Sequence, residues 1–289
     1  MTESDTATGR FVLTLACPDR KGIVAAVSRF LVEQDCNIVD SAQFGDPANG
    51  RFFLRTVFRA ERPTDAGRLT EAFASIAAYF GMDARFHDMG RKVRTLVMVS
   101  KFGHCLVDLL YRHRIGALPI EIAKIVSNHR DLEDVAAAHG VPFEYLPVEK
   151  TNKAQQEERL LSIVDGEKID LVVLARYMQI LSPALCARLE GGAINIHHSF
   201  LPSFQGARPY SQAHGRGVKL IGATAHYVTA ELDEGPIIEQ AVERVSHALT
   251  PEDYAAVGRD IESVVLARAV KWHAEHRILL NGRRTVIFS

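Results

Sequence analysis

Cysteine is scarce in this sequence and long apolar runs are absent. The four cysteines, Cys17, Cys36, Cys105 and Cys186, are scattered and form no Cys-x-x-Cys pair. This spacing argues against a disulfide framework or a structural zinc site and favours reduced thiols. No apolar stretch approaches the roughly 20 residues of a membrane span, and the polar start MTESDTATGR does not resemble a signal peptide. We therefore expect a cytoplasmic protein that does not associate with membranes.

A basic excess is also missing. The chain has 34 Lys and Arg against 35 Asp and Glu, a formal net charge of −1. It therefore lacks the charge with which nucleic-acid-binding surfaces neutralise phosphates, and we expect no nucleic-acid partner. The hydrophobic share of 47% and the charged share of 24% are those of an ordinary globular protein. At 289 residues the chain is long enough for two domains.

The first ninety residues predict a small unit of strands and helices. Ile23, Val27, Phe30 and Leu31 recur at helical spacing, and Asp19 stands where it could cap that helix. The turn DPANG between two strand-like runs is typical of a hairpin. The expected order is strand 10–17, helix 23–31, strands 37–45 and 51–60, helix 64–80 and strand 82–89. This βαββαβ order predicts a ferredoxin-like fold.

The charged joint GRKV marks the expected domain boundary, with one domain over residues 1–90 and a second over 91–289. Beyond it, short apolar strands alternate with helical patterns, which predicts an α/β domain with a mainly parallel, doubly wound sheet. The expected strands are 93–100, 120–128, 143–148, 170–176, 219–229 and 236–245, and the helices are 105–113, 132–139, 154–165 and one from Pro251. Asn281-Gly282 predicts a terminal hairpin turn.

The stretch AINIHHSFLPSFQGARPY, residues 193–210, places polar side chains at the end of an apolar strand. Ligands of doubly wound sheets bind beyond the carboxyl ends of the strands. Because side chains alternate along a strand, Asn195 and His197 point to one face and His198 to the other. A carboxamide and an imidazole on one face can donate to a carbonyl oxygen that gains charge during attack. The pair indicates a catalytic role, although either residue alone could be a polar group in a turn.

A second stretch, GATAHYVTAELDEGPII, residues 222–238, supplies further polar groups. Thr224 and His226 share one face of a predicted strand, and Asp233 lies in the loop that follows. A carboxylate beside an imidazole can activate water for attack on an acyl group. As a single residue, Asp233 could equally be a turn former.

A metal site and a serine triad are the alternatives for these residues. His197, His198, His226 and Asp233 are ligand types for zinc, but the adjacent histidines lie on opposite strand faces and no His-Glu-x-x-His motif occurs. No Gly-x-Ser-x-Gly elbow is present, and Ser199 is too close in sequence to the histidines for a normal triad. We expect no metal.

Residues 194–240, from INIHHSFLP to DEGPIIEQ, resemble the folate-dependent formyltransferases, and the likeness extends over about 93–280. It implies a catalytic triad of Asn195, His197 and Asp233, with Thr224 and His226 as supporting polar positions. LPSFQG, which contains Gly206, is similar to the loop after the first pair, and LARYMQILSP, residues 174–183, to the segment that lines the pterin pocket.

The N-terminal run LACPDRKGIVAAVSRFLVEQDCNIVDSAQF is similar to an ACT domain, a ferredoxin-like regulatory module. An ACT domain followed by a formyltransferase-type domain resembles the formyltetrahydrofolate deformylases. That resemblance implies a hydrolase acting on a linear amide C–N bond, which converts 10-formyltetrahydrofolate to tetrahydrofolate and formate with no permanently bound cofactor. The formate would supply purine biosynthesis and balance one-carbon pools. The implied substrate contacts are Arg176, Tyr177, Met178, Gln179, Ile180, Leu181, His104, Cys105 and Gly206.

The ACT resemblance also implies regulation. The expected effector pocket consists of Asp19, Lys21, Gly22 and Asn37 at the start of the first helix, where a helix N-terminus favours an amino-acid carboxylate. Helix capping and dimer packing are alternative roles for these residues. Methionine and glycine are the expected effectors. The expected assembly is a homo-oligomer, a tetramer or hexamer, with ACT domains at an interface.

Two other functions remain open on the sequence. A glycinamide ribonucleotide formyltransferase would use the same folate donor, but it needs a glycine-rich phosphate loop, and the first loop VSKFGHCLVDLL has one glycine, Gly103. The other alternative is a non-catalytic amino-acid sensor, against which the complete triad argues. The place of an amine acceptor could be filled by Lys101, Phe102, His104, Cys105, Arg208 and Tyr210.

Overall fold

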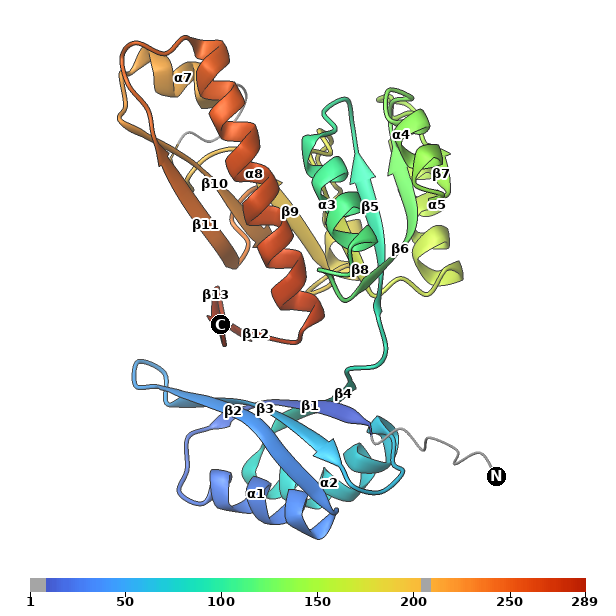
Figure 1. The fold of residues 1–289 in the computed structure, drawn as a ribbon, viewed down its shortest axis with the longest axis vertical. Coiled ribbons are helices and arrows are strands. Elements are labelled where there is room, and N and C mark those ends of the chain that lie inside the picture. The colour runs from blue at the N-terminus through green and yellow to red at the C-terminus, as the bar shows by residue number, and fades with distance from the viewer. Residues whose placement is uncertain (1–8, 204–208) are drawn as a thin grey trace. The chain divides into compact units, whose positions relative to one another are not determined.

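The computed structural model describes residues 9–203 and 209–289. They group into two compact units (Figure 1). The first unit contains the residues up to Lys92 together with Glu275–Asn281 and Thr285–Ser289, and the second contains Val93–Ala274 and Gly282–Arg284. The assignment of a regulatory role to 1–90 and a catalytic role to 91–289 stays a prediction.

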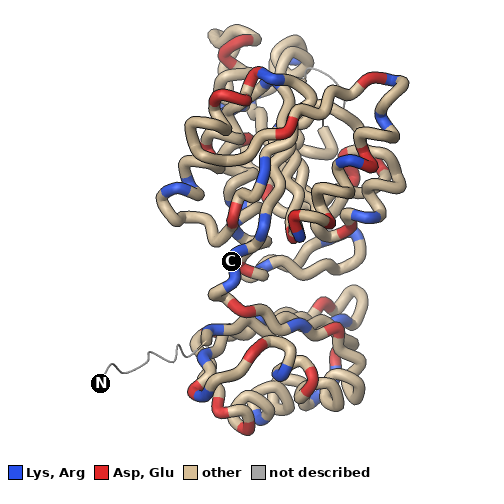
Figure 2. Tube along the Cα trace, turned by 90° about the vertical axis from the view of Figure 1, so that its right-hand side faces the viewer, with Lys and Arg blue, Asp and Glu red and all other residues tan. Residues whose placement is uncertain are grey.

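Charged residues of both signs are interspersed along the trace of each unit (Figure 2). In the part of the chain that the structure describes, no helix is both long and apolar enough to cross a membrane.

The first unit has the βαββαβ order predicted from the sequence. Its elements are β1 (Arg10–Pro18), α1 (Ile23–Glu33), β2 (Cys36–Asp46), β3 (Arg51–Ala60), α2 (Ala66–Phe80) and β4 (Asp83–Asp88). The four strands form a sheet in the order β2-β3-β1-β4, and every pairing is antiparallel. Both helices cover one face of the sheet (Figure 1) and bury the alternate strand residues that face them.

The start of α1 differs from the prediction. The stripe of Ile23, Val27, Phe30 and Leu31 is buried as expected, but the residue at the cap position is Gly22, and no side chain caps the helix. Asp19 is therefore not the cap. The chain turns between Asp19 and Gly22 with the backbone of Gly22 at φ 95°, a conformation that favours glycine, and the amide of Asp19 binds the carbonyl of Gly50 instead.

Most of the C-terminal tail, Glu275–Asn281 and Thr285–Ser289, belongs to the first unit. It forms the predicted hairpin from β12 (Ile278–Asn281) and β13 (Arg284–Ile287), and Leu279 and Phe288 pack on Ala16 and Phe53. Ala16 and Phe53 lie on the strand face that the two helices leave open, because they alternate with the residues of the helix-side core. The tail thus covers apolar surface on the second face of the sheet.

Arg55 binds the backbone at the start of this tail. It is 2% exposed, and its guanidinium donates from Nε to the carbonyl of His276 at 3.1 Å and from Nη2 to the carbonyl of Glu275 at 3.0 Å. Both carbonyls follow directly on the last helix of the second unit, which ends at Ala274. Arg55 therefore satisfies backbone acceptors that a helix end leaves without an intrahelical partner.

The second unit is the predicted α/β domain. Its sheet has the order β11-β10-β9-β8-β5-β6-β7, in which β9, β8, β5, β6 and β7 are parallel to one another, and β10 pairs antiparallel with both β9 and β11. The strands are β5 (Val93–Val99), β6 (Ile120–Ser127), β7 (Phe143–Tyr145), β8 (Leu171–Leu174), β9 (Ala193–His197), β10 (Leu220–Tyr227) and β11 (Ile237–Arg244). The prediction of a mainly parallel sheet is confirmed.

The helices of this unit lie on both faces of the sheet. They are α3 (His104–Arg114), α4 (Glu133–Ala138), α5 (Lys153–Gly166), α6 (Pro183–Arg188), α7 (Pro209–Gly215) and α8 (Pro251–Ala274), of which α6 and α7 were not predicted. Helices α5 and α6 join one core cluster with β5 and β8, whereas α3 and α8 lie in front of the sheet in Figure 1. Helix α8 packs on β9, β10 and β11 and contacts α3 and α7.

The strand order reverses beside β5. The chain runs from β5 to β6 and β7 on one side and then returns to place β8 and β9 on the other. Ligands of open α/β sheets bind beyond the carboxyl ends of the strands at such a switch point. The loops after β5, β8 and β9 begin there, so this edge is where a site is expected.

We expect Arg55→Met to lower the free energy of unfolding of the first unit by about 2–6 kcal/mol, because two partly buried carbonyls each lose a donor at about 1–3 kcal/mol. The control is Arg59→Met on the same strand, since Arg59 is exposed and pairs only with exposed Glu61; its cost should stay below about 1 kcal/mol. Urea titration followed by circular dichroism measures both. Equal effects of the two substitutions would contradict the role given to Arg55.

Candidate active site

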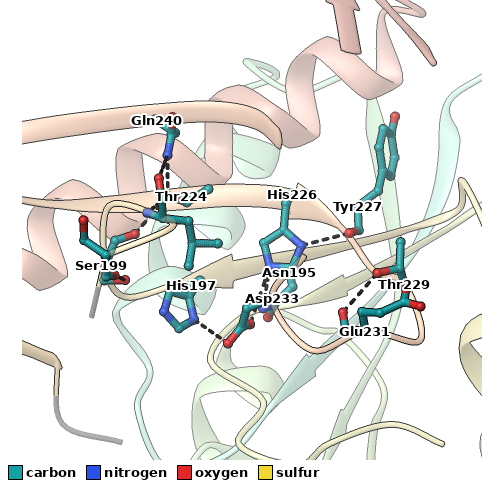
Figure 3. Close-up of polar contacts among 12 residues, drawn as sticks. Asn195, His197, Ser199, Thr224, His226, Tyr227, Thr229, Glu231, Asp233 and Gln240 are labelled. Carbon is teal, nitrogen blue, oxygen red and sulfur yellow. Dashed lines mark hydrogen bonds and ion pairs between the residues drawn. The ribbon is translucent and has the colours of Figure 1, made fainter. Parts of the chain in front are cut away.

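The register of β9 on β10 assembles a group of four polar side chains. Asn195 lies directly opposite His226, and His197 lies opposite Thr224. Directly opposed residues of an antiparallel pair point to the same face, so the four side chains stand side by side (Figure 3). His197, Thr224 and His226 are all buried. The structure thus brings together the residues that strand alternation grouped in the sequence.

His226 orients Asn195. Its Nδ1 lies 2.8 Å from the carbonyl oxygen of Tyr227, and because a carbonyl only accepts, the ring hydrogen is on Nδ1. Nε2 is then free to accept from Nδ2 of Asn195 at 3.2 Å. This bond fixes the carboxamide and leaves the second hydrogen of Nδ2 for another acceptor.

His197 and Asp233 form a close pair, with Nδ1 of His197 3.1 Å from Oδ2 of Asp233 (Figure 3). Burial raises the pKa of Asp233, but the hydrogen bond from Nδ1 of His197 outweighs burial and holds that pKa well below its ordinary value. Asp233 is therefore a carboxylate that accepts from Nδ1. Nε2 of His197 is buried and has no hydrogen-bond partner among the described residues, so it is the ring atom available for chemistry.

The loop between β10 and β11 carries Asp233 to this position. Asp233 has a left-handed backbone with φ 59°, which aspartate tolerates better than most residues. Two residues later, a side chain on Gly235 would overlap the carbonyl oxygen of Tyr227. The glycine lets the loop pass close to the end of β10, where the amide of Tyr227 binds the carbonyl of Pro236 at 2.9 Å.

Thr224 fixes the chain that follows His197. Its hydroxyl donates to the carbonyl of Ser199 at 2.9 Å and accepts from the amide of Leu201 at 3.0 Å. The side chain of Gln240 on β11 binds both Thr224 and the carbonyl of Leu201 (Figure 3). Thr224 is thus a scaffold residue that contacts the loop, whereas its neighbour His226 contacts the catalytic candidates.

A cavity of ≈ 310 Å³ opens beside this group. Asn195, His197, His226 and Asp233 line one part of it. The segment 176–181 after β8 and the loop 228–232 after β10 line most of the rest, together with Leu174, Cys186, Ile196 and His198. Six of the expected substrate contacts, Arg176, Tyr177, Met178, Gln179, Ile180 and Leu181, therefore border the same cavity as the predicted triad.

The other expected contacts lie elsewhere. His104 and Cys105 do not line the cavity; Cys105 is buried behind it, and His104 binds Glu262 on α8. Gly206 and Arg208 lie outside the described residues. The proposed effector residues Asp19, Lys21, Gly22 and Asn37 are exposed in the first unit.

Glu262 is a site residue that the sequence reasoning missed. It is 1% exposed, and its carboxylate engages His104, Tyr210 and Arg176, a group that we call the Glu262 cluster. Burial raises the pKa of Glu262, but His104, Arg176 and Tyr210 outweigh burial and lower it. The sequence does contain a pattern from which Glu262 could have been found. It lies between Ile261 and Val265, on the apolar face of a helix, where a buried carboxylate needs partners.

His104, Cys105 and Glu262 are close enough together to be considered as metal ligands. Burial raises the pKa of the Cys105 thiol, however, and a metal would need the thiolate. Glu262 already accepts from neighbouring side chains through both oxygens. We therefore interpret His104, Cys105 and Glu262 as part of a hydrogen-bonded cluster and not as the ligands of a metal ion. His197 and His198, the earlier metal alternative, contact different groups: Asp233 for His197 and the ring of Tyr210 for His198.

Comparison with known proteins shows the family to which the chain belongs. The formyl transferase family matches residues 93–270. A formyltetrahydrofolate deformylase of Corynebacterium sp. (strain P-1) is 50% identical over 279 residues, which are 96% of this chain and 98% of that protein. The crystal structure of a formyltetrahydrofolate deformylase from Burkholderia mallei ATCC 23344 is 52% identical with a TM-score of 0.93, covering 97% of this chain and 100% of that chain.

A second kind of relative matches only in part. The crystal structure of glycinamide ribonucleotide transformylase 1 from Symbiobacterium toebii is 32% identical with a TM-score of 0.63. The match covers 97% of that chain but 70% of this one. The remaining part of this chain has no counterpart in that match, whereas the deformylases match it from end to end.

The pair of His197 and Asp233 predicts a pH-dependent contribution to stability. Because the folded state lowers the pKa of Asp233, the carboxylate stabilises the fold fully above its ordinary pKa of about 3.9 and loses this effect as the pH falls through the lower folded value. The unfolding free energies of the unmutated protein and of Asp233→Asn should therefore differ most at neutral pH and converge below about pH 4. Urea titrations across this pH range test it; a constant difference would contradict the pairing.

Proposed function

Because the chain belongs to the formyl transferase family, and within it to the formyltetrahydrofolate deformylases, we propose that it hydrolyses 10-formyltetrahydrofolate to tetrahydrofolate and formate. The observation that carries the proposal is the group formed by Asn195, His197 and Asp233 at the wall of a cavity whose other wall is the segment 176–181. The group can act on a carbonyl, and the cavity is large enough to hold part of a ligand.

Asn195 and His197 are proposed to bind the formyl oxygen. Asn195 has one Nδ2 hydrogen left after its bond to His226, and Nε2 of His197 has no partner among the described residues. Asn195 is held as a donor before the substrate arrives, and Nε2 of His197 donates when the ring carries a second proton, which the carboxylate of Asp233 stabilises. In enzymes of known mechanism, removing one such donor costs about 2.7–4 kcal/mol of transition-state stabilisation.

Asp233 is proposed to orient the attacking water and to stabilise the protonated form of His197. Its lowered pKa makes it a weak base but keeps it charged at neutral pH. Because the protonated ring of His197 has no lone pair left, the proton that water loses passes to Asp233, and from Asp233 to N10 when the bond between the formyl carbon and N10 breaks. No metal or bound cofactor is required for these steps.

Residues 176–181 are proposed to bind the pterin ring. Of these, Arg176 has a left-handed backbone with φ 66°, which turns the chain out of β8 and along the cavity. Apolar side chains such as Ile180 and Leu181 can cover the faces of a flat ring while backbone groups bind its edge.

Formyl transfer to a nucleotide amine is the less favoured alternative. It needs a phosphate cradle of free backbone amides at the first loop. There Gly103 lies directly on Leu132, because an added Cβ would be 2.7 Å from Cδ2 of that leucine. The glycine therefore serves packing of the loop on its neighbour. Release of formate for purine biosynthesis remains part of the proposal.

Incubation with 10-formyltetrahydrofolate and no amine is expected to yield equimolar tetrahydrofolate and formate, measured by absorbance and by a formate assay. Asp233→Asn should lower kcat by about 10²–10⁴-fold, the usual contribution of a positioned acid or base. The control is Glu234→Gln, which changes the adjacent exposed carboxylate paired with Arg283 and should leave kcat unchanged. Release only after adding glycinamide ribonucleotide would establish the alternative instead.

Regulation by amino acids through the first unit is a further part of the proposal. The first turn of α1 has no side-chain cap, and Lys21 is exposed directly before it. Asn37, expected at the same place, is exposed at the start of β2 beside Arg59, at the opposite end of the sheet, so the prediction that it joins Lys21 in one pocket of the same unit is wrong. Uncapped amides at a helix N-terminus favour a carboxylate. We propose that the unit is an ACT domain that binds methionine or glycine in a cytoplasmic homo-oligomer, a tetramer or hexamer, with these domains at an interface.

Titration calorimetry with methionine and with glycine tests the effector site. Lys21→Ala should weaken binding by several-fold, whereas Arg85→Ala, an exposed change on β4, should not. Absence of heat with both amino acids would remove them as effectors, and size measurements with and without them would test the assembly.

A further inference from the structure

Arg176 is a buried cation whose hydrogen-bonding capacity is unused. Its side chain is 9% exposed, and Nε and Nη1 are buried without a hydrogen-bond partner among the described residues. A guanidinium carries five N–H donors and no acceptor. Buried donors that find no acceptor are costly, and they are rare in folded proteins. The side chain therefore points to a ligand that supplies the missing acceptors.

The contact with Glu262 does not supply them. Nε of Arg176 lies 3.4 Å from Oε2 of Glu262, an ion pair without the geometry of a hydrogen bond. Both oxygens of Glu262 already accept from other side chains, from Nε2 of His104 at 2.8 Å and from the hydroxyl of Tyr210 at 2.6 Å. Glu262 thus balances the charge of Arg176 and holds its guanidinium in place, while the hydrogens of Nη1 and Nη2 are left for another acceptor.

The guanidinium lies beside the catalytic group. Arg176 lines the cavity of ≈ 310 Å³ together with His197, His198 and Asp233. Burial, followed by the charge of Arg176, lowers the pKa of His198 to about 3, and the ring of His198 lies 5.1 Å from that of His197. Nε and Nη1 are the two fully buried nitrogens of the guanidinium, so Nη2 is the one that a ligand in the cavity reaches first.

The proposed reaction produces an anion in this cavity. The oxygen of water bonds to the formyl carbon, the bond from that carbon to N10 breaks, and N10 takes the proton that water has passed to Asp233. The formic acid that forms still carries the second proton of the water and loses it to solvent at neutral pH. The product that remains is formate, a small planar carboxylate.

The charges around the cavity favour a movement of formate toward Arg176. The carboxylate of Asp233 is charged again once N10 has its proton, and two like charges side by side repel each other. Glu231, which also lines the cavity, is an exposed acid. Among the described residues of the lining, Arg176 is the one with a permanent positive charge.

We infer that the guanidinium of Arg176 is the binding site for the formate that the reaction releases, and that formate bound there inhibits the enzyme as a product. The inference rests on the proposed function. The fork of Nη1 and Nη2 matches the two oxygens of a carboxylate. Glu262 opposes the charge of formate, so binding is weak and reversible, as the release of a product requires.

Inhibition by added formate tests the site. Initial rates of tetrahydrofolate formation are measured by absorbance with sodium formate or with sodium chloride at equal ionic strength. Arg176→Met removes the charge and all five donors but keeps an unbranched stem. The matched control is Arg188→Met, because Arg188 is exposed on α6, pairs with exposed Asp165 and does not line the cavity. Line broadening of ¹³C-labelled formate by each protein reports binding without turnover.

Formate should inhibit the unmutated protein and Arg188→Met more strongly than chloride does. In Arg176→Met the inhibition constant for formate should rise by about tenfold to hundredfold, the usual effect of losing a hydrogen bond to a charged group, and the line broadening should fall. If Arg176→Met does not fold, by circular dichroism, Arg176→Lys carries the comparison: it keeps a charge beside Glu262 but replaces the fork by one ammonium group, and the constant should rise in the same direction.

Three results would overturn the inference. The first is that formate neither inhibits nor binds the unmutated protein. The second is an equal inhibition constant in Arg176→Met and the unmutated protein, because formate would then stay at Asn195 and His197. The third is a raised KM for 10-formyltetrahydrofolate with an unchanged constant for formate, because Arg176 would then bind the folate alone.

The unmutated protein separates this inference from the proposed function. If it releases no formate without an amine, the proposed function fails, and the source of the ligand fails with it. If it releases formate and the inhibition constant is the same in Arg176→Met, the hydrolase function stands and only the formate site is rejected.

Discussion

The candidate site depends on the antiparallel register between β9 and β10. A shift of this register by one residue would turn Asn195 and His197 away from His226 and Thr224, because side chains alternate along both strands. The parallel strands of the sheet could not supply this pairing by themselves, since β10 runs against them. The antiparallel edge therefore places donors on β9 opposite their supports on β10, and the loop that leaves β10 returns Asp233 to the same face.

Arg55 and Glu262 are both buried and charged, but they bind different kinds of partner. Arg55 satisfies backbone carbonyls where the chain re-enters the first unit, so its charge is used to hold a main-chain segment. Glu262 gathers side chains from three segments beside the cavity. A buried charge needs partners wherever it lies, and the identity of those partners, carbonyls or side chains, distinguishes a structural joint from the wall of a site.

The sequence was sufficient for the features that depend on local pattern. Periods of 2 and 3.6 residues identified the βαββαβ unit and the mainly parallel sheet, and alternation separated His197 from His198. It was not sufficient where distant segments meet. In the sequence, Glu262 is one polar residue in a helix, and only the fold shows that His104 and Tyr210 bind it. Asp19 was predicted to be a cap because the sequence does not show the turn at Gly22.

The docking of the tail also escaped prediction, and it has a consequence for how the molecule can be divided. The first unit is made from both ends of the chain, and the second unit is inserted between them. A fragment that stops at Lys92 would lack Leu279 and Phe288 and would leave Phe53 without its cover. A complete first unit would require a new junction that joins the tail to the N-terminal segment, as in a circular permutation, whereas the second unit consists of the continuous segment Val93–Ala274 and the turn Gly282–Arg284 of the tail.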